Sequence, residues 1–169
     1  MDFIYRRGEY KDVVAMDALM QKVNDSIKDK AIFSADNRES IKAHIEDEGR
    51  IVAAFCQDKL VAFFMLRYPK SAPDNLGLDL GYDTESLNLV AHMESIVVDF
   101  EYRGHGLQQI LMTKGEEIAV EEGYKYLLCT VSPDNPHSLN NALKRGFKII
   151  KTKEKYGGFM RHILCKKVN

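Results

Sequence analysis

The chain has few cysteines, almost no net charge and no long apolar run, and each shortage excludes a class of protein. A formal net charge of −1 gives no electrostatic basis for binding nucleic acid or an anionic membrane surface. No apolar run approaches the length of a membrane span, and the N-terminal residues lack the charged-then-apolar pattern of a secretion signal. We therefore expect a cytoplasmic protein with no nucleic-acid or membrane partner.

The three cysteines, Cys56, Cys129 and Cys165, are odd in number and widely spaced, and they form no C-x-x-C pair. Each lies in a predicted strand. Buried free thiols are therefore expected rather than metal ligands or a nucleophile. No histidine–carboxylate cluster has metal-ligand spacing either, so we expect no metal.

The remaining composition is that of an ordinary globular chain. It has 169 residues, of which 45% are hydrophobic and 29% charged, and no internal repeat or low-complexity tract divides it. This length is sufficient for one domain with its own core. We therefore expect a single domain over residues 1–169.

Apolar periodicity and turn residues predict the order strand, two helices, hairpin, strand, helix, strand, helix and two strands. The expected elements cover residues 2–7, 10–23, 36–48, 50–57, 60–67, 93–98, 106–122, 126–131, 135–145, 147–152 and 161–166. Residues 68–87 show no clear periodicity and form a long connection, which is often functional in a compact domain. This order predicts an α/β fold with a mixed central sheet flanked by helices.

Three of the predicted helices carry detailed expectations. The first should bury one face made of Val13, Met16, Leu19, Met20 and Val23. The helix over residues 106–122 should bury a face made of Leu107, Ile110, Leu111, Gly115, Ile118 and Ala119. In that helix Gly115 should allow a close approach to the sheet. The second helix should start with a capping box over residues 36–39.

The stretch 92–107, H-M-E-S-I-V-V-D-F-E-Y-R-G-H-G-L, joins an apolar strand to a short glycine loop and then to a helix. The first turn of a helix has unpaired N–H groups and the positive end of the helix dipole, so it attracts phosphate. Gly104 and Gly106 lack a Cβ that would keep an anion from these amides, and Arg103 adds a guanidinium. The sequence therefore predicts a phosphate-binding loop, although a surface turn that needs glycines is the alternative.

Three kinds of phosphate loop are candidates. A Walker A loop needs a Lys-Ser/Thr pair, but Leu107 and Gln108 follow the glycines here. A dinucleotide fingerprint needs a third glycine, and Gln109 stands in its place. The coenzyme A loop Q/R-x-x-G-x-G/A is matched at its first and fourth places and missed at the last, where Gln108 replaces a small residue.

With V-x-x-x-Y-R-G-x-G-L around this loop, the chain resembles the GCN5-related N-acetyltransferases (GNAT). The family's second motif, similar to N-x-x-A/S-x-x-x-Y-x-x-x-G-F, is matched by Asn135, Ser138, Gly146 and Phe147. Its tyrosine is replaced by Ala142. The resemblance implies acetyl-CoA as acyl donor and a pantetheine slot between a fourth and a fifth strand that splay apart. It also implies coenzyme contacts by Ile96, Val97, Val98, Arg103, Gly104, His105, Gly106, Leu107, Gln108, Asn135 and Ser138.

Acetyl transfer to an amine needs a neutral amine, a polarised carbonyl and a proton for the departing thiolate. The resemblance places a base or water-holding carboxylate on the strand before the loop, and H-x-E-x-I-x-V looks like the corresponding strand of glucosamine-phosphate acetyltransferases. We favour Glu94 as the base, with His92 orienting it or lining the pocket; a partly exposed structural glutamate is the alternative. Backbone N–H groups near residues 96–98 would polarise the carbonyl.

The proton donor is the least determined role, because Ala142 replaces the family's tyrosine. Tyr156, which precedes two glycines, is the best substitute, against an exposed loop tyrosine or direct release of thiolate. Residues 74–85 carry four acidic and no basic side chains, which would attract a cationic amine if they surrounded a pocket; a solvated loop is the alternative.

The sequence thus favours an acetyl-CoA-dependent N-acetyltransferase acting on a small-molecule or peptide amine, as a monomer or homodimer. A non-catalytic acyl-CoA-binding or sensing module is the main alternative, for which Ala142 is the principal argument. A protein-interaction domain that retains the fold without the ligand is a third possibility.

Overall fold

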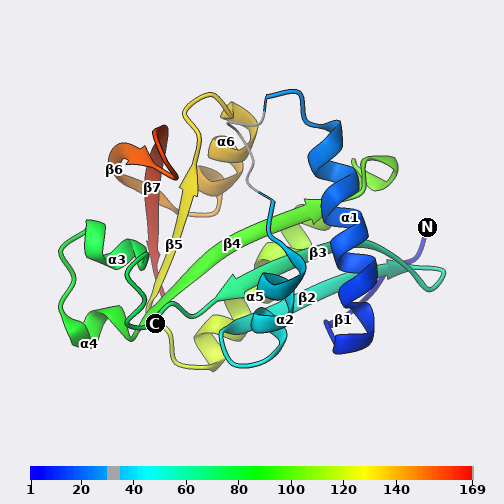
Figure 1. Ribbon diagram of the computed structural model, residues 1–169, viewed down its shortest axis with the longest axis horizontal. Coiled ribbons are helices and arrows are strands. Elements are labelled where there is room, and N and C mark those ends of the chain that lie inside the picture. Colours follow the sequence, from blue (N-terminus) through cyan, green and yellow to red (C-terminus); the bar gives the residue numbers. More distant parts are fainter. Residues whose placement is uncertain (30–34, 169) are drawn as a thin grey trace. The chain divides into compact units, whose positions relative to one another are not determined.

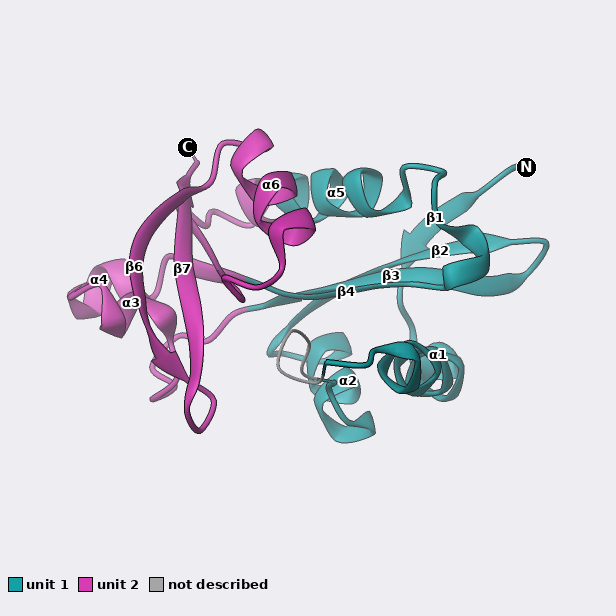
Figure 2. Ribbon diagram, turned by 90° about the horizontal axis from the view of Figure 1, so that it is seen from above, with its two compact units in different colours: residues 1–67, 93–118 teal, residues 68–92, 119–169 magenta. Residues whose placement is uncertain are grey.

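The computed structural model describes residues 1–29 and 35–168, which form two compact units. Unit 1 comprises residues 1–67 and 93–118, and unit 2 comprises residues 68–92 and 119–169 (Figures 1 and 2). Parallel and antiparallel strand pairs occur together, with helices on both faces of the strands. The α/β fold class with a mixed sheet and flanking helices is confirmed. The expectation of one domain stays a prediction.

The strands of unit 1 follow the order β1-β2-β3-β4. They are β1 (Ile4–Arg7), β2 (Gly49–Cys56), β3 (Lys59–Arg67) and the larger part of β4 (Val90–Val98). Figure 2 shows α1 (Val13–Ser26) and α2 (Arg38–Ile45) on one face of these strands and α5 (Leu107–Glu121) on the other. Two short 3-10 turns, η1 (Tyr10–Asp12) and η3 (Phe100–Tyr102), precede α1 and α5.

The predicted apolar face of α1 is confirmed. All five of its residues are buried and pack with Ile41 of α2, Ile51 of β2 and Phe63 of β3. The hairpin of β2 and β3 is confirmed too. Gln57 and Asp58 adopt φ values of +47° and +63°, so the two-residue turn lies one residue earlier than predicted. Positive φ at both central positions matches the right-handed twist of the flanking strands.

The capping of α2 differs from the prediction by one residue. Asn37, not Asp36, is the N-cap, and its side chain accepts from the N–H of Ser40. Asp36 instead accepts from the hydroxyl groups of Ser40 and Ser95, at 3.0 and 2.7 Å. The tertiary bond to Ser95 of β4 competes with the capping role, which the sequence pattern does not reveal.

Helix α5 begins and ends close to the predicted bounds. A Cβ built on Gly115 would lie 2.2 Å from Cε1 of Phe64, so the predicted close approach to the sheet is confirmed. Leu107, Leu111 and Ala119 are fully buried. The prediction was wrong for Ile110, which is 37% exposed because it lies beside the buried stripe rather than within it.

Replacing Gly115 with alanine is expected to destabilise the fold by about 1–3 kcal/mol, the usual cost of overpacking a filled core. The methyl group would collide with the Phe64 ring, which is itself 2% exposed. The shift of the urea midpoint measures this cost. Glu117→Ala, on the exposed side of the same helix, is the control and should change stability by no more than about 0.5 kcal/mol. Equal midpoints for the two variants would contradict the close approach.

The strands of unit 2 follow the order β4-β5-β7-β6. They are the start of β4, β5 (Tyr126–Val131), β6 (Lys148–Lys155) and β7 (Phe159–Lys167), with α6 (Pro136–Lys144) between β5 and β6. Residues Val90–His92 of β4 pair in parallel with Tyr126–Leu128 of β5, and the other pairs are antiparallel. The slot that the resemblance implies between β4 and β5 stays a prediction.

The long connection contains two short helices that the sequence did not predict, α3 (Leu76–Asp79) and α4 (Thr84–Leu87). Each is a single turn, too short to show a helical period. Leu76 packs with Val90, Leu128 and Ile163 in the core of unit 2. This connection is therefore part of the packed structure of unit 2.

Candidate functional site

The predicted phosphate loop occupies residues 103–106 of unit 1, between η3 and the start of α5. Gly104 and Gly106 have φ values of +83° and +73°, a region that side chains rarely adopt. A Cβ built on either glycine would meet no atom within 4 Å. The glycines are thus required by backbone conformation, and the space beside them is open to a ligand.

The residues around these glycines differ in exposure. The side chains of Arg103 and His105 are exposed, and the His105 ring lies 5.6 Å from that of Phe3. Leu107 is 2% exposed and anchors the first turn of α5, so only its backbone is available to a ligand. Gln108 is half-buried. Together with the unpaired N–H groups of a helix start, Arg103 provides donors suited to a pyrophosphate.

Strand β4 carries the predicted base. The side chain of Glu94 is exposed in the middle of the strand, whereas Val97 is buried in the core of unit 1. Ile96 and Val98, two and four residues beyond Glu94, are half-buried. Side chains that alternate along a strand place Glu94, Ile96 and Val98 on the same face.

His92, predicted to support Glu94, lies in unit 2 and has a structural partner. It is 3% exposed, and its Nε2 accepts a hydrogen bond of 3.0 Å from the backbone N–H of Leu76. Because a backbone N–H only donates, Nε2 carries no proton, and the neutral ring has its proton on Nδ1. His92 therefore holds the start of α3; its predicted role toward Glu94 stays a prediction.

Tyr156, the predicted proton donor, lies in the tight turn between β6 and β7. Its φ is +52°, an unusual value for a bulky residue, and its hydroxyl group lies 2.9 Å from Oγ1 of Thr130. The guanidinium of Arg161 is 5.7 Å from the centroid of its ring. Strain of this kind persists where surrounding contacts hold it and is frequent at functional positions.

Asn135 and Ser138, the predicted coenzyme contacts of unit 2, form the N-terminal cap of α6. Oδ1 of Asn135 accepts from the N–H of Ser138 at 3.2 Å. Ala142 is buried, and its carbonyl group accepts from the N–H of Phe147. This position is thus part of the packing between α6 and the start of β6.

The acidic side chains of residues 74–85 are less available to a cationic substrate than the composition of this stretch suggests. Both oxygens of Asp79 are engaged, by Lys153 and Lys155 at 2.6 Å each. Burial alone would raise the pKa of Asp79, but these two lysines lower it below its ordinary value. Asp83 caps α4 by accepting from the N–H of Ser86. At least two of the four acidic side chains therefore have structural roles.

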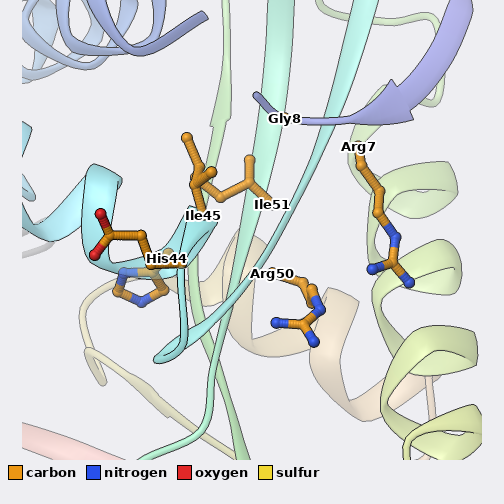
Figure 3. Close-up of a pocket in the computed structure, with 7 residues that line it drawn as sticks. Arg7, Gly8, His44, Ile45, Arg50 and Ile51 are labelled. Atoms are coloured by element: carbon orange, nitrogen blue, oxygen red, sulfur yellow. The ribbon is translucent and has the colours of Figure 1, made fainter. Parts of the chain in front are cut away.

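A polar hollow of about 290 Å³ lies elsewhere in unit 1, where β1 ends and β2 begins. Figure 3 shows the side chains of Arg7 and Arg50 on one side of β2 and that of His44 on the other. Nδ1 of His44 lies 2.6 Å from the carbonyl oxygen of Ser40, and its buried Nε2 has no hydrogen-bond partner among the residues that the structure describes. None of the predicted site residues lines this hollow.

Cys56 and Cys129 are free and buried, as predicted, whereas the free Cys165 is only half-buried. Burial raises the pKa of the Cys129 thiol to about 12. A thiol with so high a pKa is a poor nucleophile at neutral pH. Among the described residues, no group of three or more His, Cys, Asp or Glu side chains is arranged to hold a metal ion. The helices within residues 1–29 and 35–168 are all too short or too polar to cross a membrane.

The sequence model of the acetyltransferase (GNAT) family matches residues 16–147. The structure is similar to an acetyltransferase of the GNAT family from Streptococcus pneumoniae, with a TM-score of 0.75, 16% identity and coverage of 99% of this chain and 100% of that chain. It is also similar to the ribosomal-protein-S18-alanine N-acetyltransferase from Escherichia coli, with a TM-score of 0.72, 14% identity and coverage of 98% and 94%.

A third similar structure is yncA from Salmonella typhimurium, solved with its cofactor acetyl-CoA. Its TM-score is 0.72 at 12% identity, and the match covers 100% of this chain and 95% of that chain. At such low identities, these likenesses show the fold alone. No curated protein sequence matches the chain.

Proposed function

Since the chain belongs to the GNAT family of acetyltransferases, we propose that it moves an acetyl group from acetyl-CoA to a primary amine of a small molecule or peptide by direct transfer. The observation that carries this proposal is the loop of residues 103–106. Its two glycines have positive φ values beside open space at the start of a long helix. This geometry fits the pyrophosphate of coenzyme A, and only the short turn η3 separates the loop from the strand that carries Glu94.

The coenzyme would be held by the backbone N–H groups of residues 104–108 and by the Arg103 guanidinium, with the backbone of residues 96–98 along its pantetheine arm. Bound acetyl-CoA supplies a thioester, which is an activated acyl donor. The fixed N–H dipoles of β4 would stabilise negative charge that develops on the acyl oxygen. In the second motif, Asn135 and Ser138 are proposed to contact the coenzyme in addition to capping α6.

Glu94 is proposed to remove the proton from the amine. A free alkyl ammonium has a pKa near ~10, so at neutral pH most of the substrate is protonated and unreactive. The exposed Glu94 carboxylate can attract the cation and accept its proton, directly or through water. The nitrogen lone pair is then free to attack the acyl carbon.

Tyr156 is proposed to donate a proton to the departing thiolate. Its hydroxyl group is oriented by Thr130, and this contact helps to hold the backbone of Tyr156 at its positive φ. Tyr156→Phe is expected to lower kcat by roughly tenfold to a hundredfold without weakening coenzyme binding, because only the proton donor is lost.

Thr130→Val removes the orienting hydroxyl group and keeps the size of the side chain, so it should show a smaller loss of the same kind. The control is Tyr124→Phe, an exchange of the same two residue types away from this turn, with unchanged kcat expected. If Tyr156→Phe turns over like wild type while Glu94→Gln loses turnover, the thiolate leaves without a proton from Tyr156.

A non-catalytic acyl-CoA-binding or sensing module is the second candidate, and Ala142 is the observation that favours it. Its buried methyl group has no proton to donate. Turnover with an amine panel separates the two candidates, because both bind coenzyme A and only the enzyme releases free thiol. The panel should include dipeptides with a free N-terminus, polyamines and amino sugars, assayed by thiol detection.

A further inference from the structure

Asp99 is a buried carboxylate at the junction of β4 and the coenzyme loop. It is 1% exposed, and its N–H donates to the carbonyl oxygen of Val61 in β3 at 2.9 Å. Its Oδ1 accepts from the N–H of Glu101 at 3.1 Å, and its carbonyl oxygen accepts from the N–H of Tyr102 at 2.9 Å. The turn η3 is therefore folded around Asp99. Arg103, the first residue of the coenzyme loop, directly follows the last residue of this turn.

The charge of Asp99 is matched by a lysine from a distant helix. Nζ of Lys22, in α1, lies 2.9 Å from each carboxylate oxygen of Asp99 and 3.2 Å from Oε2 of Glu101. The same ammonium group lies 4.3 Å from the centroid of the Phe100 ring. Lys22 thus contacts the turn by two ion pairs and one cation–π interaction.

Lys59, at the start of β3, completes this arrangement. Its Nζ lies 3.7 Å from Asp99 and 3.6 Å from Glu101, and 5.1 Å from the centroid of the Tyr102 ring. We name Lys22, Lys59, Asp99 and Glu101 the Asp99 node. Burial alone would raise the pKa of Asp99, but hydrogen bonds from Lys22 and the Glu101 N–H hold it below its ordinary value. The carboxylate is therefore ionised at neutral pH, and its buried charge is compensated by the ammonium groups of Lys22 and Lys59.

We infer that Lys22 and Asp99 are positioning residues for the coenzyme loop, which hold η3 so that residues 103–106 keep the conformation that receives a pyrophosphate. This inference rests on the proposed function. Neither residue is proposed to touch the coenzyme. Their contribution is to order the loop before binding, so that the coenzyme does not have to order it.

Loss of the Lys22 charge should affect coenzyme affinity and the acetyl-transfer step differently. A loop that is held less firmly binds the coenzyme more weakly, whereas Glu94 and the strand that carries it are unchanged. Removing the Lys22 charge should therefore raise the KM for acetyl-CoA much more than it lowers kcat at saturation. A residue that acted only on global stability would lower the melting temperature without this split.

Lys22→Met is the decisive variant, because it keeps an unbranched stem near Phe100 and removes the ammonium group. Arg38→Met is its matched control. Arg38 also forms an ion pair with α1, to Asp17 at 2.8 Å, but it belongs to α2, so this ion pair joins α1 to α2 and not to the turn before the loop. Calorimetry should show at least tenfold weaker coenzyme A binding for Lys22→Met and a change below twofold for Arg38→Met. Lys22→Arg should restore affinity to within about threefold.

A second measurement needs no coenzyme. Amide hydrogen exchange over residues 100–106 should accelerate at least fivefold in Lys22→Met and in Asp99→Asn, and remain at the wild-type rate in Arg38→Met. The double variant Lys22→Met/Asp99→Asn should bind coenzyme A no more weakly than whichever single variant binds it less tightly, because both changes break the same ion pair.

Equal affinity and equal exchange for Lys22→Met and wild type would overturn the inference and leave the proposed function intact. If wild type itself fails to bind coenzyme A at millimolar concentration, both fail. If Arg38→Met loses as much affinity as Lys22→Met, the effect belongs to α1 as a whole, and the positioning role is rejected.

Discussion

Replacing Gly106 with aspartate is expected to abolish acetyl-CoA binding. The φ of +73° at this position disfavours any side chain, and the open space beside the glycine is where the proposed pyrophosphate lies. An aspartate there would combine a backbone cost of about 1–2 kcal/mol with negative charge against a phosphate group. We expect no heat of binding in calorimetry at coenzyme concentrations where wild type is saturated.

Gly81→Asp is the matched control, because Gly81 has the same φ of +73° and the same open surroundings. It lies in the connection between β3 and β4 and should cost similar stability without affecting coenzyme affinity. If Gly106→Asp and Gly81→Asp both bind like wild type, the loop of residues 103–106 is a structural turn and not a phosphate site.

Replacing Glu94 with glutamine is expected to reduce turnover by roughly 10²-fold or more, the usual scale for a positioned general base. The amide has nearly the same shape but neither attracts a cation nor accepts its proton. Coenzyme affinity should be unchanged, because Glu94 is not proposed to contact the phosphates. The acidic limb of the pH–rate profile, which reports protonation of the base, should disappear with the activity.

Glu117→Gln removes another exposed carboxylate, on α5, and is the control for charge removal; it should turn over like wild type. Full activity of Glu94→Gln on the true substrate would show that another group or the solvent accepts the proton. Loss of coenzyme binding in this variant would instead assign Glu94 to binding and leave the base unidentified.

Local pattern predicted those features of the fold that depend on neighbours in sequence. The apolar stripe of α1, the hairpin of β2 and β3 and the close approach at Gly115 are confirmed, although the hairpin turn lies one residue earlier than predicted. Each follows from periodicity or from the conformational freedom of a particular residue type. The helices α3 and α4 escaped prediction because a single turn has no period.

The errors arose where distant residues compete with a local pattern. Asp36 was predicted as part of a capping box, but its side chain bonds to Ser95, 59 residues later. The Asp99 node was missed altogether because 77 residues separate Lys22 from Asp99. The sequence identifies which residues precede the loop, but only the fold shows that Lys22 of α1 contacts them.

The candidate site was predictable to a similar extent. The glycine loop could be located from residue types and spacing alone, and the structure gives it the expected backbone. The catalytic roles were harder, because they depend on partners. His92 accepts a hydrogen bond from the N–H of Leu76, and the Tyr156 hydroxyl lies beside that of Thr130. Neither contact can be predicted from the sequence pattern.

We propose that this chain uses acetyl-CoA to acetylate an amine. The most direct test of this proposal is an amine panel incubated with wild-type protein and acetyl-CoA, with release of free thiol followed over time and acetylated products identified by mass spectrometry. We expect thiol release above the hydrolysis background for at least one amine, with an equal amount of acetylated product and no activity in Gly106→Asp. Coenzyme binding without thiol release for any amine, or acetylation that persists in Gly106→Asp, would contradict it.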